Sequence, residues 1–220
     1  ASNRFAPTYI DGISGAVRME SSNGTVTVEN SGGPVTIDNR FGEVSVRNVG
    51  GEVQVDNSNA PVRVYRTSGP AIINNQFGPV SAHKINGDTE VFNRNGSVEL
   101  VEINGSTTVR ASTGLITGEK LKGPFFIDNQ DGSVELVQLQ GINSDCEVST
   151  TFGDIRLELP RTGQFNISAQ TSFGDIKSEV PMEITSSGSV SSGQSLVGGS
   201  QPTISLSGRN ATIGITRAKK

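Results

Sequence analysis

The sequence predicts an all-β fold: a single-stranded parallel β-helix (β-solenoid) with about 18 residues and two short strands in each coil. Three observations carry this prediction. Glycine recurs every nine residues, apolar and polar residues alternate between the glycines, and alternate nine-residue units differ in one column. Only 33% of the 220 residues are hydrophobic and 5% aromatic. A repeat array tolerates this composition because each unit buries only a thin stripe against its neighbours.

Glycine defines the nine-residue period. It occupies fourteen of the fifteen equivalent positions from Gly15 to Gly141, and Ala60 fills the remaining one. Such regularity is not expected by chance from 27 glycines in 220 residues, so it indicates a backbone requirement. We expect these glycines to adopt positive φ where the chain turns into each strand.

Short strands are predicted between the glycines. Apolar residues stand two and four positions after most glycines, as in Val26 and Val28 or Val98 and Leu100. This alternation is typical of a strand with one buried face, and β-branched residues, which suit a pleated surface, dominate it. We expect parallel stacking, with one strand in each nine-residue unit.

A second period of eighteen residues makes two units into one coil. Seven positions after alternate glycines the chain is apolar, as at Val49, Ile85 and Ile103, whereas after the intervening glycines it is polar, as at Arg40 and Arg94. The two units are therefore not equivalent, and a coil contains one of each kind.

Asparagine also recurs at the eighteen-residue spacing and forms a candidate structural ladder of Asn39, Asn57, Asn75, Asn93 and Asn129, interrupted by Ala111. Stacked coils place equivalent residues about 4.8 Å apart. Because an amide has both a donor and an acceptor, we expect these side chains to point inward and bond one another along the stack. The alternative is that Asn merely suits a turn, which explains its frequency but not its restriction to one column.

We expect one continuous domain, with a lead-in at residues 1–14, regular coils at 15–141 and irregular, longer coils at 142–220. The motifs FGDIRLELP and FGDIKSEVP repeat there with a spacing of twenty-one positions, so each coil is about three residues longer than the regular ones. Residues 185–202 are rich in Ser and Gly and are predicted to be a flexible loop. Alternation returns at residues 203–216, which are expected to cap the C-terminal end.

No catalytic or metal-binding constellation is evident, so we expect neither an enzyme nor a cofactor. His83, the only histidine, belongs to an outward column with Arg47, Tyr65 and Val101. Cys146, the only cysteine, is interpreted as a small buried residue. Histidine-based metal sites and catalytic triads are disfavoured by this composition. A calcium-binding β-roll is also disfavoured because it needs an acidic residue in every coil.

Four phenylalanines that precede a glycine form a candidate interaction surface: Phe41, Phe77, Phe152 and Phe173. Together they could stack against sugars. The alternative, which is the more common fate of such aromatic residues, is packing over a corner of the coil.

The strings SSNGTVTVEN, TTFGDIRLELP and TSFGDIKSEVP, followed by a Ser/Gly stretch and a last short strand, resemble a bacterial family of adhesin-like β-solenoid domains of unknown function. The resemblance covers essentially the whole chain, and the doubled FGD motif is its most specific part. It implies an exported or membrane-tethered protein and supplies no active-site residues.

From these features we expect a non-catalytic, extracytoplasmic structural or adhesin-like module, in the periplasm or at the cell surface, whose tether or signal lies outside this chain. Its partner would be a protein or a surface glycan, with at most weak homo-oligomerisation. The net charge of −4 argues against nucleic acid, and no segment approaches the ~20 apolar residues of a membrane span. The alternatives are a self-assembling scaffold similar to the bactofilins and, third, a carbohydrate-active β-helix.

Overall fold

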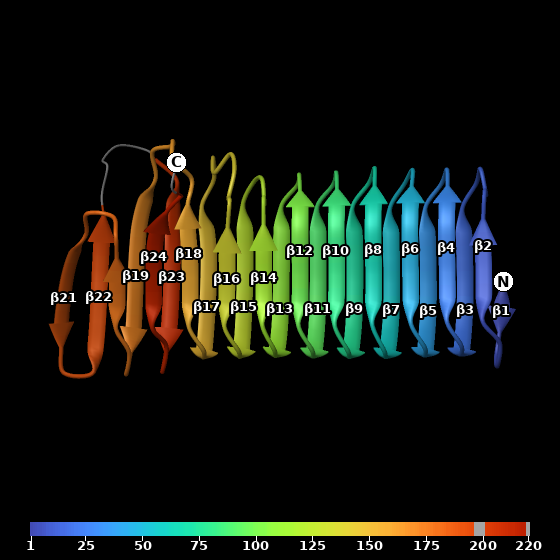
Figure 1. The fold of residues 1–220 in the computed structure, drawn as a ribbon, viewed down its shortest axis with the longest axis horizontal. Helices are drawn as coiled ribbons and strands as arrows, with labels where there is room; N and C mark the ends of the chain where they lie inside the picture. Colours follow the sequence, from blue (N-terminus) through green and yellow to red (C-terminus); the bar gives the residue numbers. More distant parts are fainter. Residues whose placement is uncertain (196–200, 219–220) are drawn as a thin grey trace.

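The computed structural model describes residues 1–195 and 201–218. Strands make up 66% of the chain, and the described residues contain no helix. Two long sheets extend along the molecule and face each other across a shared core. Successive strands alternate between the two sheets through most of the chain (Figure 1). The predicted all-β solenoid, with a coil of about eighteen residues, is confirmed. No helix in the described part of the chain is long and apolar enough to cross a membrane.

Within the described residues, sheet A contains thirteen strands. Beginning at the N-terminal end of the stack, they are β1 (Ser2–Asn3), β3 (Val17–Asn23), β5 (Val35–Phe41), β7 (Val53–Asn59), β9 (Ala71–Phe77), β11 (Thr89–Asn95), β13 (Thr107–Thr113), β15 (Phe125–Asp131), β17 (Cys146–Phe152), β23 (Thr203–Arg209), β19 (Asn166–Ser172), β22 (Val190–Ser195) and β21 (Glu183–Ser187). Neighbouring strands of the regular coils are parallel, and each residue pairs with the residue eighteen positions later, as Thr89 pairs with Thr107.

In the part of the chain that the structure describes, sheet B contains eleven strands. In the same direction they are β2 (Thr8–Asp11), β4 (Val26–Ser31), β6 (Val44–Val49), β8 (Val62–Thr67), β10 (Val80–Ile85), β12 (Val98–Ile103), β14 (Ile116–Glu119), β16 (Val134–Val137), β18 (Ile155–Leu159), β24 (Ile213–Arg217) and β20 (Ile176–Ser178). Val80 pairs with Val98, one regular period later, whereas Val134 pairs with Ile155, three positions beyond that period. The longer C-terminal coils predicted from the sequence begin at this step.

The core is a thin layer between the two sheets. Inward side chains such as Val55 and Ile73 of sheet A and Leu100 of sheet B are fully buried. Another column closes the corner that follows sheet B, and its buried members include Val49, Ile85, Ile103, Leu121 and Leu139. Burial of one such side chain contributes about 1.5–3 kcal/mol. Repetition of this contribution along the stack stabilises a chain that is poor in aromatic residues.

The periodic glycines serve two corners for different physical reasons. Gly96, at the corner from sheet A to sheet B, has a φ of 142°, as expected. At the other corner, the positive φ belongs to a residue three positions before the glycine, such as Glu102 at 58°. Gly105 is required there because a Cβ would lie 2.5 Å from the backbone of Gly87 in the preceding coil. The expectation that every repeat glycine adopts positive φ is therefore wrong at this corner from Gly15 to Gly105, although Gly123 and Gly141, at 91° and 61°, do adopt it.

Residues 1–14 already take part in the stack. They contain β1 and β2, which pair in parallel with β3 and β4. β1 spans only two residues, so sheet A is narrow at this end. The segment expected to be a lead-in therefore contributes a first, short coil.

The closing strands do not cap the C-terminal end, which corrects the sequence prediction. The chain turns back, and β23 and β24 insert between the coil of β17 and β18 and the coil of β19 and β20 (Figure 1). The carboxylates of Asp145 and Asp154 accept hydrogen bonds from the backbone N–H groups of Thr203 and Thr212 at 2.7 and 3.0 Å. These carboxylates fix the starts of the two inserted strands.

The last position in sheet A belongs instead to an antiparallel hairpin of β22 and β21. The prediction of a flexible loop at residues 185–202 is therefore wrong as far as Ser195. The Ser/Gly composition conceals the strand alternation because the inward residues, Ser191 and Gly193, are small and not apolar. Residues 196–200 of the predicted loop lie outside the described residues.

Candidate functional site

The four candidate phenylalanines are exposed but do not form one surface. Their exposed fractions range from 48% to 64%. Phe41 and Phe77 stand in one outward column with Asn59 between them, and Phe152 follows in the same column beyond three polar residues. Phe173 comes directly after the end of β19. The structure therefore separates these rings by polar positions and does not join them into a stacking strip.

The asparagine column faces the interior, just before the corner from sheet A to sheet B. Its members Asn39, Asn57, Asn75, Asn93 and Asn129 are at most 4% exposed. Their amide groups mainly bond the carbonyls of the corner residues, as Asn93 Nδ2 donates to Gly96 O at 2.9 Å and to Gly78 O at 3.2 Å. Among the described residues, one direct amide pair joins the column, from Asn57 Nδ2 to Asn75 Oδ1 at 3.3 Å.

The column is therefore mainly a set of hydrogen bonds from asparagine amides to backbone carbonyls, and not the expected ladder of amide-to-amide bonds. A carbonyl at a tight corner cannot reach the strand of the neighbouring coil, and a buried acceptor without a donor costs about 1–3 kcal/mol. Asparagine supplies that donor on a short side chain. Its role here is structural, and the outer face of the same strands carries the candidate site.

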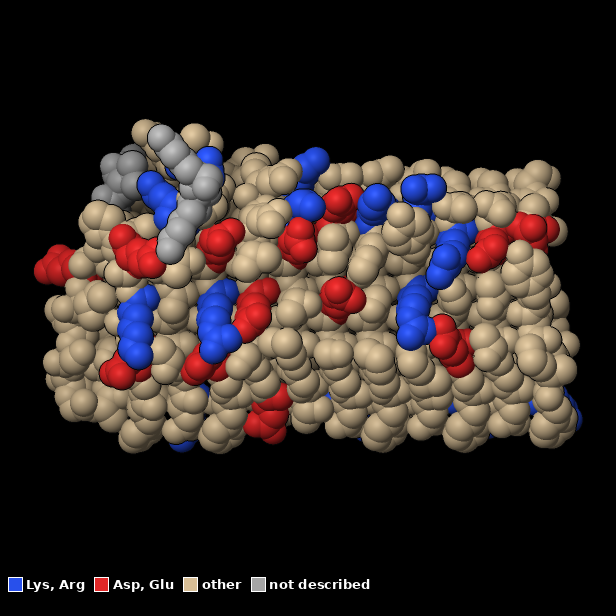
Figure 2. Space-filling model, viewed as in Figure 1, with Lys and Arg blue, Asp and Glu red and all other residues tan. Residues whose placement is uncertain are grey.

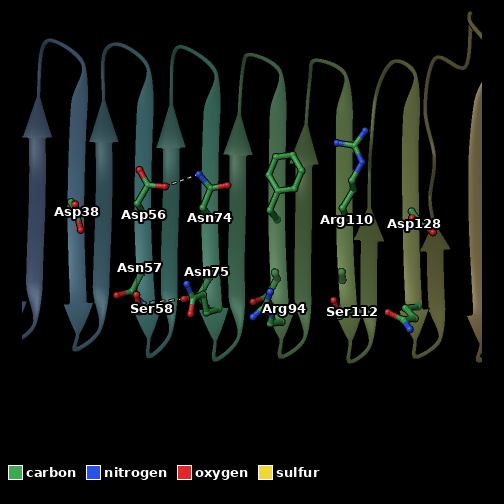
Figure 3. A pocket seen from close by; sticks show the side chains of 15 residues that line it. Asp38, Asp56, Asn57, Ser58, Asn74, Asn75, Arg94, Arg110, Ser112 and Asp128 are labelled. Carbon is green, nitrogen blue, oxygen red and sulfur yellow. Dashed lines mark hydrogen bonds between the residues drawn. The ribbon is translucent and has the colours of Figure 1, made fainter.

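The outer face of sheet A carries a shallow groove with a volume of about 510 Å³, called the sheet A groove below. Because strand residues alternate between faces, the residues on either side of each inward asparagine point outward. They form two rows along the solenoid axis, with the groove between them (Figure 3). The first row is Asp38, Asp56, Asn74, Phe92, Arg110 and Asp128, and the second is Ser58, Gln76, Arg94, Ser112 and Gln130.

Polar side chains in the first row are held by hydrogen bonds along the stack. Asn74 Nδ2 donates to Asp56 Oδ1 at 2.6 Å (Figure 3). Near the other end of the groove, the Ser149 hydroxyl donates to Asp128 Oδ1 at 2.8 Å. Each of these carboxylates keeps lone pairs that can accept a further bond from a ligand.

The centre of the sheet A groove combines an aromatic ring with two cations. The guanidinium carbon of Arg110 lies 5.4 Å from the ring centroids of both Phe92 and Phe126. Arg94 stands one position after the buried Asn93 and lines the same part of the groove. Within the described ranges, neither guanidinium forms an ion pair. Both are therefore available to an acidic ligand.

Sequence reasoning did not find this groove, although a signal was present. Phe92 and Arg110 are separated by one full period and pair in register, so the repeat places them side by side. Phe126 lies one coil beyond Arg110, paired with Thr108 of the same strand as Arg110. Extending the eighteen-residue column analysis to outward positions would have revealed the cluster.

The outer face of sheet B carries a second, mixed surface. His83 lies between Tyr65 and Val101 in the outward column expected from the sequence, and its Nε2 is 3.3 Å from Glu99 Oε2. Tyr65 also has the side chain of Lys84 over its ring, 5.7 Å from the centroid. Acidic and basic side chains are interspersed across the view in Figure 2 and do not gather into one patch of a single sign.

Cys146 begins β17 and is 3% exposed. Its thiol donates to the carbonyl oxygen of Ser144 at 3.4 Å. Burial, which disfavours the charged thiolate, raises the pKa of this thiol to about 11. The residue is therefore part of the packing of its coil.

Native Cys146 should be nearly inert to Ellman's reagent at pH 8. A thiol with a pKa of about 11 has a thiolate fraction on the order of 100-fold lower than that of an ordinary cysteine. We expect reaction in the folded protein to be slower by at least that factor than in guanidinium, and to accelerate as the pH approaches 11. Ser58→Cys in a Cys146→Ser background is the control and should react at an ordinary rate. Fast reaction of native Cys146 would contradict its burial.

In the described part of the chain, no three His, Cys, Asp or Glu side chains come together in a group that could hold a metal ion. A protein-family model described as Toastrack DUF4097 matches residues 9–204, which is most of the chain. Neither curated proteins nor solved structures give a match.

Proposed function

The chain belongs to the Toastrack (DUF4097) family, a β-solenoid family of unknown function, and from this premise we propose that it is a non-catalytic, extracytoplasmic structural or adhesin-like module. In this proposal the solenoid is a rigid support, and its outer sheet face contacts the partner. Family membership is in agreement with the resemblance seen in the sequence.

The observation that carries this proposal is the sheet A groove. Six consecutive coils, from Asp38 to Asp128, contribute one outward residue each to its first row. Neighbouring coils are about 4.8 Å apart, so the row presents a long and regular contact surface. Rigid sheets fix these side chains before binding, which lowers the entropic cost of recognition.

The arrangement of the acidic groups also favours binding over catalysis. Asp56 is bonded to Asn74 and Asp128 to Ser149, so these carboxylates are part of polar rows along the stack. Such rows suit hydrogen bonding to an extended ligand.

A self-assembling scaffold is supported less well by the shape of the two ends. At the N-terminal end, β1 and β2 are strands of the same first coil. At the other end, sheet A continues through β22 and β21 beyond β19, whereas sheet B ends at β20 among the described strands. The two edges at the C-terminal end are therefore not level, and a second copy could not pair with both of them.

Labelling of cells that produce the full-length protein tests the proposed compartment. A membrane-impermeant amine reagent should reach exposed lysines such as Lys84 and Lys122 in cells whose inner membrane is intact, after permeabilisation of any outer membrane. A cytoplasmic protein measured in the same cells serves as the control and should remain unlabelled. Labelling that occurs only after lysis would overturn the extracytoplasmic role.

A further inference from the structure

We propose that the sheet A groove binds an acidic glycan, with one sugar ring stacked on Phe92 and the carboxylate of that sugar bound by Arg110. This inference rests on the proposed function because it names the partner of the same surface. It depends on the chemistry of the central coils, where an aromatic ring, several planar amides and two guanidinium groups come together, neither guanidinium being ion-paired within residues 1–195 and 201–218.

Phe92 supplies the stacking surface. It is partly exposed, lines the groove and pairs in register with Asn74 on one side and Arg110 on the other. A pyranose has one face made of C–H groups and an edge made of hydroxyls. The face can cover an aromatic ring and exclude water while the hydroxyls remain directed at the polar rows. An extended peptide does not offer this combination at regular intervals.

Arg110 supplies the charge selectivity. Its guanidinium carbon lies 5.4 Å from the ring centroids of both Phe92 and Phe126. These two cation–π interactions restrict the Arg110 side chain before a ligand arrives. A stacked guanidinium still directs its N–H groups outward in its own plane, where they can bind a carboxylate in a bidentate manner. Arg94 lies in the second row, two positions after Phe92 on the same strand, and adds a second positive charge to the groove.

Hydroxyl groups of the glycan find partners on both sides of the ring. Asn74 and Gln76 precede Phe92 by one coil, and Ser112 follows Arg94 by one coil. Asp56 and Asp128 stand further out along the groove and can accept hydrogen bonds from neutral sugars of the chain. These carboxylates would repel a ligand charged along its whole length, so the groove favours carboxylated sugars flanked by hydroxyls over a dense polyanion.

Calorimetric titration of the intact protein tests the proposal with oligosaccharides of three carboxylated probes, hyaluronate, unsulfated chondroitin and heparosan, in each of which a carboxylated sugar alternates with a neutral one. At least one should bind, and methyl esterification of its carboxylates should weaken binding by about tenfold or more, as loss of a charge-assisted hydrogen bond implies. Phe92→Ala and Arg110→Gln should each weaken binding by a similar factor. Arg110→Lys should restore only part of the affinity because lysine lacks the planar fork.

Arg40→Gln is the matched control. Arg40 belongs to the second outward column, three coils before Arg94 and outside the groove, so the substitution removes the same charge from the same face. The affinity of the Arg40→Gln variant for the glycan should stay within about twofold of that of the unmodified protein, because Arg40 does not contact the ligand. Thermal unfolding of each variant verifies that the outward substitutions leave the fold intact.

Three results would overturn the proposal: absence of binding to all three probes, equal binding of the methyl ester, or an equal loss in Arg40→Gln and Arg110→Gln. The proposed function fails by a different readout, the labelling of intact cells. Glycan binding by a protein found only inside the cytoplasm would preserve the groove chemistry and reject the extracytoplasmic role. Labelling of intact cells without glycan binding would preserve the extracytoplasmic role and reject the groove chemistry.

Discussion

Gly105→Ala is expected to destabilise the protein by about 3 kcal/mol or more. The new Cβ would collide with backbone atoms of the preceding coil, and moving a side chain cannot relieve such a clash. The added Cβ would lie 2.5 Å from the carbonyl carbon and oxygen of Gly87 and 2.6 Å from the nitrogen of Asp88. The coils on either side would have to separate. The adjoining hydrogen bonds between coils, such as Asn104 N–H to Ile85 O at 2.9 Å, would be strained or lost.

Gly15→Ala is the control, since Gly15 occupies the same column and nothing lies within 4 Å of the Cβ it would acquire. Its unfolding free energy should change by no more than about 1 kcal/mol, with stabilisation favoured because alanine restricts the unfolded chain. Urea denaturation of the two variants measures the difference. A similar, small effect at both positions would mean that the coils accommodate a Cβ, and the close-approach explanation for this column would fail.

Asn93→Leu is expected to lower the free energy of unfolding by about 3 kcal/mol, the sum of a lost hydrogen bond and added strain. Asn93 Nδ2 donates to Gly96 O, which would otherwise receive a second amide from position 111, but that position holds alanine. The substitution therefore leaves a corner carbonyl without its side-chain donor, at a cost of about 1–3 kcal/mol. Leucine must also fit a corner shaped for an amide, which adds strain of about 1–3 kcal/mol. Gly78 O is affected less because Asn75 also donates to it, at 3.0 Å.

Gln76→Leu, at an exposed outward position one coil earlier, is the comparison for this prediction. It should change stability by no more than about 0.5 kcal/mol, as surface substitutions usually do. Denaturant unfolding followed by circular dichroism gives both values. If the two variants were equally stable, the asparagine column would be a local turn preference and not a clamp on the corner carbonyls.

The regular part of the fold could be predicted because its determinants are local and repeated. The alternation at Val26 and Val28, the glycine period and the difference between Val49 and Arg40 fix the strands, the corners and the length of a coil. In a solenoid each coil contacts mainly the coils next to it in sequence. One period along the sequence is therefore also one step between coils in space, as the pairing of Thr89 with Thr107 shows.

The candidate site was only partly within reach of the same reasoning. The sequence search looked for aromatic residues beside glycine and found Phe41 and Phe77, which stand in a column broken by Asn59. The sheet A groove is instead built around Phe92 and Arg110, in a column where no residue type repeats regularly. A search for repetition favours structural columns, whereas a binding site is made of the positions that depart from the repeat.

The sequence by itself determined the class of fold, the two-strand coil, the inward and outward faces and the longer C-terminal coils, because alternation and period act between neighbouring coils. Only the tertiary structure decided the order of the last coils. Pairing of β23 between β17 and β19 depends on free strand edges and on the carboxylates of Asp145 and Asp154, which bond residues 58 positions away. Contacts over such a separation leave no period in the sequence. The bonding of the asparagines was decided by the geometry of the corner. For four of the five amides the shortest bond goes to the carbonyl three residues later in the same coil, and for Asn129 it goes to Gly114 O in the preceding coil.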